Sequence, residues 1–207
     1  QQVLENLWWR LDRKLSLDDV EVSAKVILLD AIRKGTTTLV DHHASPGAIR
    51  GSLGRIAKAV KESGLRSCLC YEVSDRDGGT VTEEGLEENA AFARESAAAN
   101  DPQLRALFGL HAAFTLSDET LAKASRLGHD LGVGFHVRVA EAASDVASNR
   151  SRVGKSPAAR LAAIRAHRRG PFGNAQSRRP QRLVGQADVE LDLRPPAEYD
   201  SASRPPI

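Results

Sequence analysis

The chain has 207 residues, of which 41% are hydrophobic and 27% charged, and its formal net charge is +2. This composition is typical of a globular domain and excludes collagen-like and wholly disordered proteins. No apolar run approaches the roughly 20 residues that cross a bilayer, and the N-terminal residues lack the basic and apolar regions of a signal peptide. We therefore expect a cytoplasmic protein with no membrane partner.

Charge and proline content divide the chain near residue 147. Residues 1–147 have a net charge of −5, whereas residues 148–207 have +7 and hold most of the prolines. Residues 148–187 contain no Asp or Glu. Such a stretch buries too little apolar surface to offset the entropy of ordering it. We expect 148–207 to be a poorly packed or disordered tail, with some helix over 157–166.

Helical and strand patterns alternate through residues 1–147. Apolar residues at helical spacing, with capping and closing residues, predict helices over 17–34, 48–63, from 82 onward, and over 118–131. Between them, β-branched and apolar runs predict strands over 36–40, 67–73, 104–110 and 135–139. Units of this kind call for a parallel sheet, because parallel strands need long crossover connections.

A parallel α/β chain forms either a closed barrel or an open doubly wound sheet. No Gly-rich phosphate loop follows a predicted strand. The polar residues favour the barrel, because they gather at or just past the carboxyl ends of the predicted strands, around what would be one mouth. These residues are Asp41, His42, His43, Glu72, Asp75, Asp77, His111, His136 and Glu141.

Histidines and cysteines on the predicted strands have structural as well as functional interpretations. His111 follows the strand 104–110, and alone it is more often a partly buried histidine bonded to a carbonyl. His42 and His43 are adjacent, so on a regular strand they point to opposite faces and cannot both bind one ion. Cys68 and Cys70 share a strand face. We expect them to be reduced core residues, with a metal or redox role as the minor alternative.

The segment GFHVRVAE is the most informative part of the sequence. His136 and Arg138 share a strand face, and Glu141 lies just beyond the strand. There a carboxylate could move protons to and from a metal-bound water. The structural alternative is that Glu141 caps the next helix or pairs with Arg138.

Five motifs occur in order over residues 3–146: LENLWWRLDRKL, KGTTTLVDHHASP with GSL, LCYEVSDRDG, GLHAAFTLSDETL and GFHVRVAEAASD. Together they resemble the amidohydrolase superfamily, in particular the branch of the aminohydrolase SsnA, the chlorohydrolases and the nucleobase deaminases. The resemblance implies a TIM-like barrel and one or two divalent metals, zinc or iron, whose bound hydroxide attacks a C–N carbon. It assigns the predicted strands to the second to fifth of that barrel, His111 to substrate binding and Glu141 to acid/base catalysis.

The sequence departs from the family pattern at the metal ligands. The His-x-His strand implied ahead of residue 1 is not in the sequence. Arg138 stands where the family has a metal-binding histidine, and a guanidinium offers no lone pair to a cation. After residue 146, the histidine-bearing sixth strand and the aspartate-bearing eighth strand are not recognisable, and His167 lies on no apolar strand. We expect this chain to bind no metal. We also expect its tail to be the product of a frameshift in the coding sequence.

Three functions remain open. The first is that of a fragment of a metal-dependent amidohydrolase, acting on C–N bonds of a small heterocyclic or cyclic amidine or amide substrate. The second is a catalytically inert, degraded gene product. The third is nucleic-acid binding through the Arg-rich tail, although it lacks interleaved aromatic residues and any recognisable binding module. The uncovered edges of a partial barrel also favour a homo-oligomer.

Overall fold

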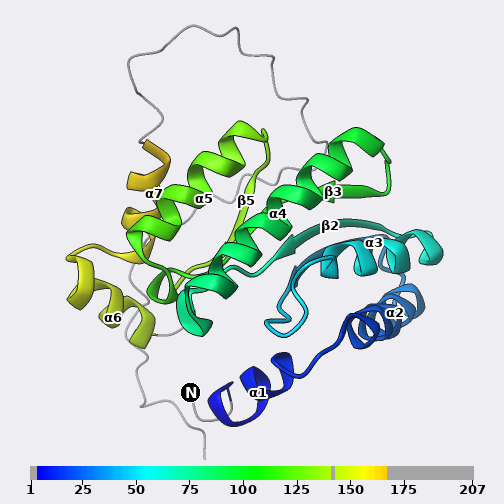
Figure 1. The fold of residues 1–207 in the computed structure, drawn as a ribbon, viewed down its shortest axis with the longest axis horizontal. Helices are drawn as coiled ribbons and strands as arrows, with labels where there is room; N and C mark the ends of the chain where they lie inside the picture. The colour runs from blue at the N-terminus through cyan, green and yellow to red at the C-terminus, as the bar shows by residue number, and fades with distance from the viewer. Residues whose placement is uncertain (1–3, 141–142, 167–207) are drawn as a thin grey trace, which may run out of the picture. The chain divides into compact units, whose positions relative to one another are not determined.

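The computed structural model describes residues 4–140 and 143–166, in which helices alternate with parallel strands (Figure 1). The helices are α1 Trp9–Asp12, α2 Leu17–Arg33, α3 Ser52–Ser63, α4 Gly79–Ala99, α5 Asp118–Asp130, α6 Ala143–Val153 and α7 Pro157–Ala166. The strands are β1 Thr38–His43, β2 Arg66–Tyr71, β3 Leu104–Ala106, β4 Phe108–Ala112 and β5 Phe135–Arg138. A π-helical turn, Leu4–Trp8, precedes α1, and 3₁₀ turns occupy Asp75–Asp77 and Ala113–Thr115. None of the described helices has the length and apolarity to cross a membrane.

All the pairings between the described strands are parallel. β1 pairs with β2 and β2 with β3, and β4 pairs with β5, all in parallel. A parallel bridge between Val73 and Leu110 joins the two groups, and so does a hydrogen bond from the Leu107 amide to the Leu69 carbonyl. The predicted parallel arrangement is confirmed for the described strands, but the predicted strand 104–110 is divided at Leu107 into β3 and β4.

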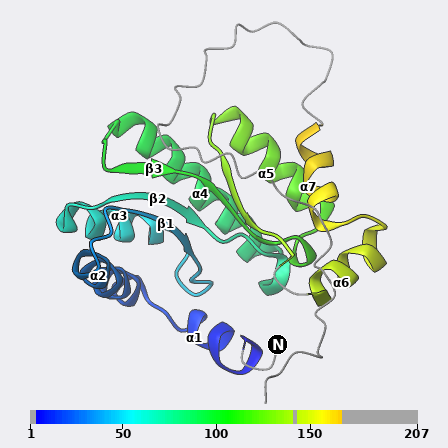
Figure 2. The ribbon, with the colours of Figure 1, turned by 180° about the vertical axis from the view of Figure 1, so that it is seen from behind.

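Helices α3, α4 and α5 cover one face of the strands (Figure 1). Figure 2 shows the strands from the opposite side. Successive side chains of β2 point alternately to the helix-covered face and to the opposite face. Leu69 and Tyr71 are buried in the core under the helices, so Cys68, Cys70 and Glu72 lie on the opposite, inner face. Other large side chains of the core are Leu53, Leu86, Phe108 and Leu121.

Helix α2 begins at a capping box. The Ser16 hydroxyl accepts from the Asp19 amide, and the Asp19 carboxylate accepts from the Ser16 amide, as the sequence predicts for this start. The buried residues of α2 include Val20, Leu28 and Ala31. The apolar residues whose spacing predicts the helix, Val22, Val26, Leu29 and Ile32, are instead exposed. Periodicity therefore identifies this helix but not the side that is covered.

The side chain of Asn89 on α4 holds β2 and β4 together. Its Oδ1 accepts from the amides of Tyr71 at 2.9 Å and Gly109 at 3.2 Å, and its Nδ2 donates to the Tyr71 carbonyl at 2.9 Å. A Cβ atom on Gly109 would lie 2.2 Å from the Tyr71 carbonyl oxygen. The close approach of these two strands therefore requires glycine at position 109.

The helices α6 and α7 continue the described structure past residue 147. The helix predicted over 157–166 is confirmed by α7. Asn149 and Arg160 are buried, and Arg160 forms an ion pair with Asp118 at 2.6 Å and donates to the Leu116 carbonyl at 2.9 Å. At these two positions the side chains are better packed than we predicted for a poorly packed tail. Residues 167–207 lie outside the described residues, and the division of the chain at 147 stays a prediction.

Candidate active site

A pocket of about 690 Å³ opens at the carboxyl ends of the parallel strands. Its walls include Trp9 and Arg76, the aromatic ring of Phe114, and three residues at or just past the ends of β2, β4 and β5, namely Glu72, His111 and Arg138. Parallel α/β proteins bind their ligands at this edge. The structure thus brings together, around one pocket, polar residues that the sequence places at the ends of different strands.

Glu72 is the centre of the polar wall. Its side chain is 10% exposed and accepts a hydrogen bond from Arg76 at 3.0 Å. Arg138 Nη1 lies 3.6 Å from the carboxylate, and the Nε2 atoms of His111 and His42 lie 3.5 and 3.6 Å from it. Burial raises the pKa of Glu72 to about 7, while the charges of Arg76 and Arg138 oppose that rise.

His111 is buried with a defined hydrogen-bond pattern. The Thr115 hydroxyl donates to the Ala112 carbonyl at 2.9 Å, so its oxygen accepts from His111 Nδ1 at 2.8 Å. This assigns the ring proton to Nδ1 and leaves Nε2 with a lone pair on the side of Glu72. Burial lowers the pKa of His111 to about 3, which keeps the imidazole neutral. His111 can therefore accept a hydrogen bond from a ligand N–H.

Arg138 occupies the position where the resemblance implies a metal ligand. Its guanidinium is directed to the Glu72 carboxylate. Because the group keeps its proton and offers no lone pair, the residues present do not fit a metal ion at this position. Glu141, the acid/base residue implied by the resemblance, lies outside the described residues.

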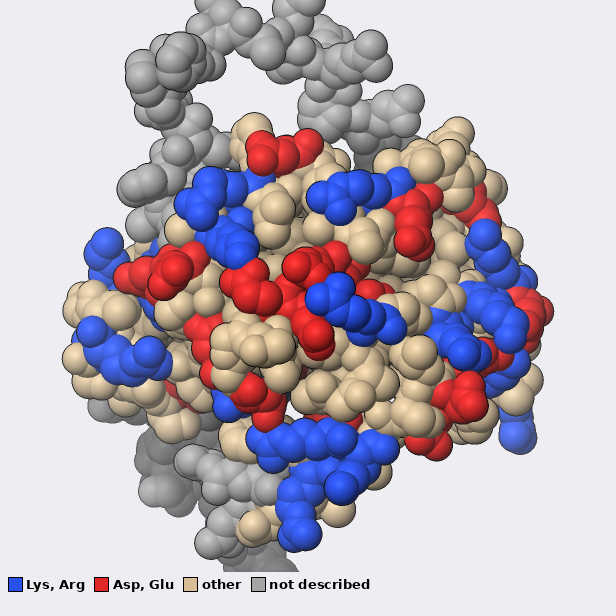
Figure 3. Space-filling view, viewed as in Figure 1, with Lys and Arg blue, Asp and Glu red and all other residues tan. Residues whose placement is uncertain are grey.

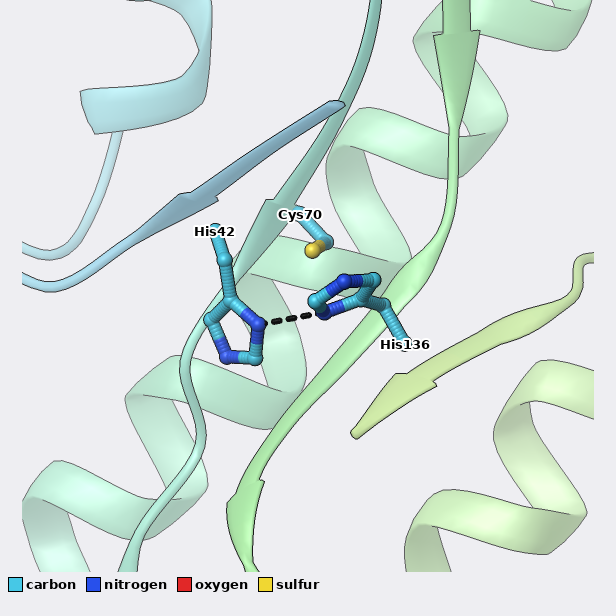
Figure 4. Close-up of side chains that lie close together, drawn as sticks. All are labelled: His42, Cys70 and His136. Atoms are coloured by element: carbon cyan, nitrogen blue, oxygen red, sulfur yellow. Dashed lines mark hydrogen bonds between the residues drawn. The ribbon is translucent and has the colours of Figure 1, made fainter. Parts of the chain in front are cut away.

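Three potential metal ligands meet on the inner face of the strands (Figure 4). They are His42 on β1, Cys70 on β2 and His136 on β5, and their donor atoms all lie within 4.8 Å of one another. The two imidazoles approach at 2.5 Å between their Nδ1 atoms. The Cys70 thiol donates to the Asp41 carbonyl at 3.3 Å, and burial raises its pKa to about 12.

The other residues of the predicted functional edge have structural contacts. His43 points away from His42, as predicted for adjacent strand residues, and its Nε2 bonds the Ser45 hydroxyl at 2.8 Å. Asp75 accepts from the Ser117 amide at 2.6 Å, at the start of α5, and Asp77 pairs with Arg13 at 2.6 Å. The sequence interpretation missed the approach of Cys70 to the two histidines, because alternation fixes a strand face but not the register between strands.

A sequence profile described as the amidohydrolase family matches residues 1–162. The chain belongs to the amidohydrolase family. Its relatives include the 5-methylthioadenosine/S-adenosylhomocysteine deaminase of Pelotomaculum thermopropionicum, 31% identical over 149 residues, which are 72% of this chain and 32% of that protein. Another is the 5'-deoxyadenosine deaminase of Methanosarcina barkeri, 31% identical over 155 residues, 73% of this chain and 34% of that protein.

Solved structures of a deaminase and a chlorohydrolase have a similar fold. The zinc-bound adenosine deaminase from Xanthomonas campestris superimposes with a TM-score of 0.69 and 19% identity, over 79% of this chain and 36% of that chain. The atrazine chlorohydrolase TrzN from Arthrobacter aurescens, complexed with zinc and atraton, gives a TM-score of 0.59 and 17% identity, over 79% and 38%. The resemblance to the deaminase and chlorohydrolase branch is confirmed. This amidohydrolase chain spans about a third of the length of the curated relatives it matches.

Proposed function

We propose that the pocket is the substrate site of a C–N bond hydrolase, that the described α/β units are part of a TIM-like barrel, and that the substrate is an amino-substituted nitrogen heterocycle of the purine nucleoside kind. Membership of the amidohydrolase family and the deaminase relatives support the reaction class. The pocket's position at the carboxyl ends of parallel strands supports its role as the binding site.

The walls of the pocket suit a flat, polar ligand. The aromatic residues Trp9 and Phe114 line the pocket, and the Arg76 guanidinium lies over the Trp9 ring, 4.6 Å from its centre. The observation that carries the proposal is the buried His111, whose unprotonated Nε2 can accept from a ring or exocyclic N–H of the heterocycle. The volume of about 690 Å³ is within the range of small-molecule sites.

Ligand binding without turnover is the second candidate, and Arg138 favours it. A guanidinium at the position of a metal ligand cannot activate a water molecule, so no step of the proposal passes through a metal there. In the hydrolase alternative, Glu141 is the proposed proton carrier, on the basis of its place in the family motif.

The nucleic-acid hypothesis rests on the Arg-rich tail, of which residues 167–207 lie outside the described residues, and the described helices give it little support. Figure 3 shows basic and acidic side chains interspersed over the helix-covered face. Arg50 pairs there with Glu84 and Glu87, and Lys123 pairs with Glu83. A phosphate backbone prefers a continuous basic strip, which this mixture of charges does not offer.

Calorimetric titration of the full chain with adenosine and 5'-deoxyadenosine tests the proposal, with ammonia release measured in parallel. We expect saturable binding that His111→Phe weakens about tenfold, as loss of one buried hydrogen bond predicts. His129→Phe, at an exposed histidine of α5, is the matched control. Ammonia release supports the hydrolase, and binding without release supports the second candidate. Absence of saturable binding, or equal binding by the His111 variant, overturns the assignment of the pocket.

A further inference from the structure

We propose that His42, Cys70 and His136 form a binding site for a zinc-type divalent transition metal on the inner face of the strands. The site is separate from the position of Arg138, and it does not depend on the proposed hydrolysis. Two imidazoles and one thiolate are the donors that borderline and soft metals such as Zn²⁺ and Co²⁺ prefer.

Strand register places the first two ligands side by side. β1 and β2 are parallel neighbours, and His42 is the register partner of Cys70. Both side chains lie on the inner face, opposite the helices. The position of His42 is further defined on its other side, because its Nε2 lies 3.6 Å from the Glu72 carboxylate. A carboxylate behind the second nitrogen of a coordinating histidine is the usual second-shell arrangement, and it directs Nδ1 to the metal.

The third ligand reaches this pair across a glycine. His136 on β5 is the register partner of Gly109 on β4, and β4 adjoins β2. An added Cβ at Gly109 would lie 3.0 Å from Cys70 Cβ. The missing side chain leaves room for the His136 ring to reach over β4, to a centroid separation of 4.6 Å from the His42 ring (Figure 4).

The geometry requires only a small adjustment to hold an ion. Tetrahedral zinc with nitrogen ligands at about 2.0 Å and sulfur at about 2.3 Å separates the nitrogens by about 3.3 Å and each nitrogen from sulfur by about 3.6 Å. The Nδ1 atoms of His42 and His136 are 2.5 Å apart, and all three donors fall within 4.8 Å. The imidazole nitrogens therefore separate by about an ångström, the sulfur approaches them by at most about as much, and the fourth position of the ion is open to water.

Charge and proton balance are also satisfied. The thiol proton of Cys70, now donated to the Asp41 carbonyl, passes to solvent when the sulfur coordinates. The proton that one Nδ1 now donates to the other moves to Nε2 of its own ring, so that both Nδ1 atoms have a lone pair for the metal and both imidazoles stay neutral. One thiolate and two neutral imidazoles leave a single positive charge on the Zn²⁺ site. The nearby carboxylate of Glu72, 3.6 Å from His42 Nε2, offsets that charge.

Cobalt spectroscopy of the full chain tests the site. One equivalent of Co²⁺ is expected to produce tetrahedral d–d bands and a thiolate-to-cobalt charge-transfer band, and Zn²⁺ is expected to displace it. C70S should abolish the charge-transfer band, and H136Q should weaken metal affinity by at least about tenfold. The matched controls are C68S, two residues away on the same strand face, and H43Q, whose side chain points to the other face. Both controls should bind cobalt as the parent does.

Circular dichroism and thermal unfolding of each variant establish that it is folded. The parent chain also tests the proposal by itself, because a folded parent that gives no charge-transfer band at one equivalent of Co²⁺ overturns the site. A band that persists in folded C70S, or that is lost in C68S but not in C70S, overturns it equally. Ammonia release is not measured in this experiment, so failure of the metal site and failure of the proposed hydrolase are distinguishable.

Discussion

Asn89 and Tyr71 exchange two buried hydrogen bonds of 2.9 Å, one in each direction, between helix α4 and strand β2. The same carboxamide accepts from the Gly109 amide of β4. Asn89→Ala should therefore leave backbone groups of both strands without partners in a place that water does not reach. We expect a loss of about 3 kcal/mol in the free energy of unfolding, measured by urea denaturation. Glu87→Ala on the exposed side of α4 is the control, and an equal loss there would contradict the argument.

Gly109→Ala tests the close approach of β2 and β4. Its Cβ would lie 2.2 Å from the Tyr71 carbonyl oxygen, so the strands must move apart, and we expect a loss of at least about 2 kcal/mol. Gly54→Ala is the matched control, because a Cβ there meets no atom within 4 Å and α3 gains a better helix former. That variant should be more stable by up to about 1 kcal/mol. Equal stability changes in the two variants would show that the close approach of β2 and β4 does not require glycine at position 109.

The sequence predicts the elements of this fold better than their contacts. The capping box at Ser16 and the run over 157–166 identify helices correctly, because both signals are local. The exposed side of α2 could not be found in this way, since apolar spacing does not say what covers a helix. Likewise, the alternation of residues puts Cys70 and Glu72 on one strand face, but register and a distant glycine bring His136 to Cys70.

Glu21 on α2 should make stability dependent on acidic pH. The buried carboxylate accepts from Lys25 and Lys58 at 2.8 Å and from Arg55 at 3.0 Å, and these bonds lower its pKa from 4.5 to about 2. A lowered folded-state pKa stabilises the fold above the unfolded value, and this contribution is lost as the pH falls through the folded one. E21Q should thus be less stable than the parent at pH 7, and the difference should vanish between pH 4.5 and about 2. Thermal unfolding across that range is the measurement. A difference that stays constant with pH would contradict the assignment.

Arg160 should stabilise the packing of helix α7 against the start of α5. Its buried guanidinium pairs with Asp118 and donates to the Leu116 carbonyl, which joins α7 to the start of α5. Arg160→Ala leaves that carbonyl without its donor, and we expect a loss of about 2 kcal/mol, since the Asp118 side is largely solvated. Hydrogen exchange should accelerate over 157–166 more than over α4. Arg150→Ala, at an exposed arginine of α6, should leave exchange there unchanged.

The last prediction concerns the guanidinium of Arg138 and the proposed metal site. Arg138 lies 3.6 Å from the same Glu72 carboxylate that faces His42, so its charge both repels an incoming cation and competes for the balancing carboxylate. Arg138→Gln removes that charge and should tighten Co²⁺ binding about tenfold, which corresponds to about 1.4 kcal/mol. Arg105→Gln, the same change at the exposed arginine of β3, is the control. The gain should shrink as salt rises, because screening weakens the repulsion in the parent. Unchanged or weaker cobalt binding by folded R138Q would show that the metal does not bind beside Glu72.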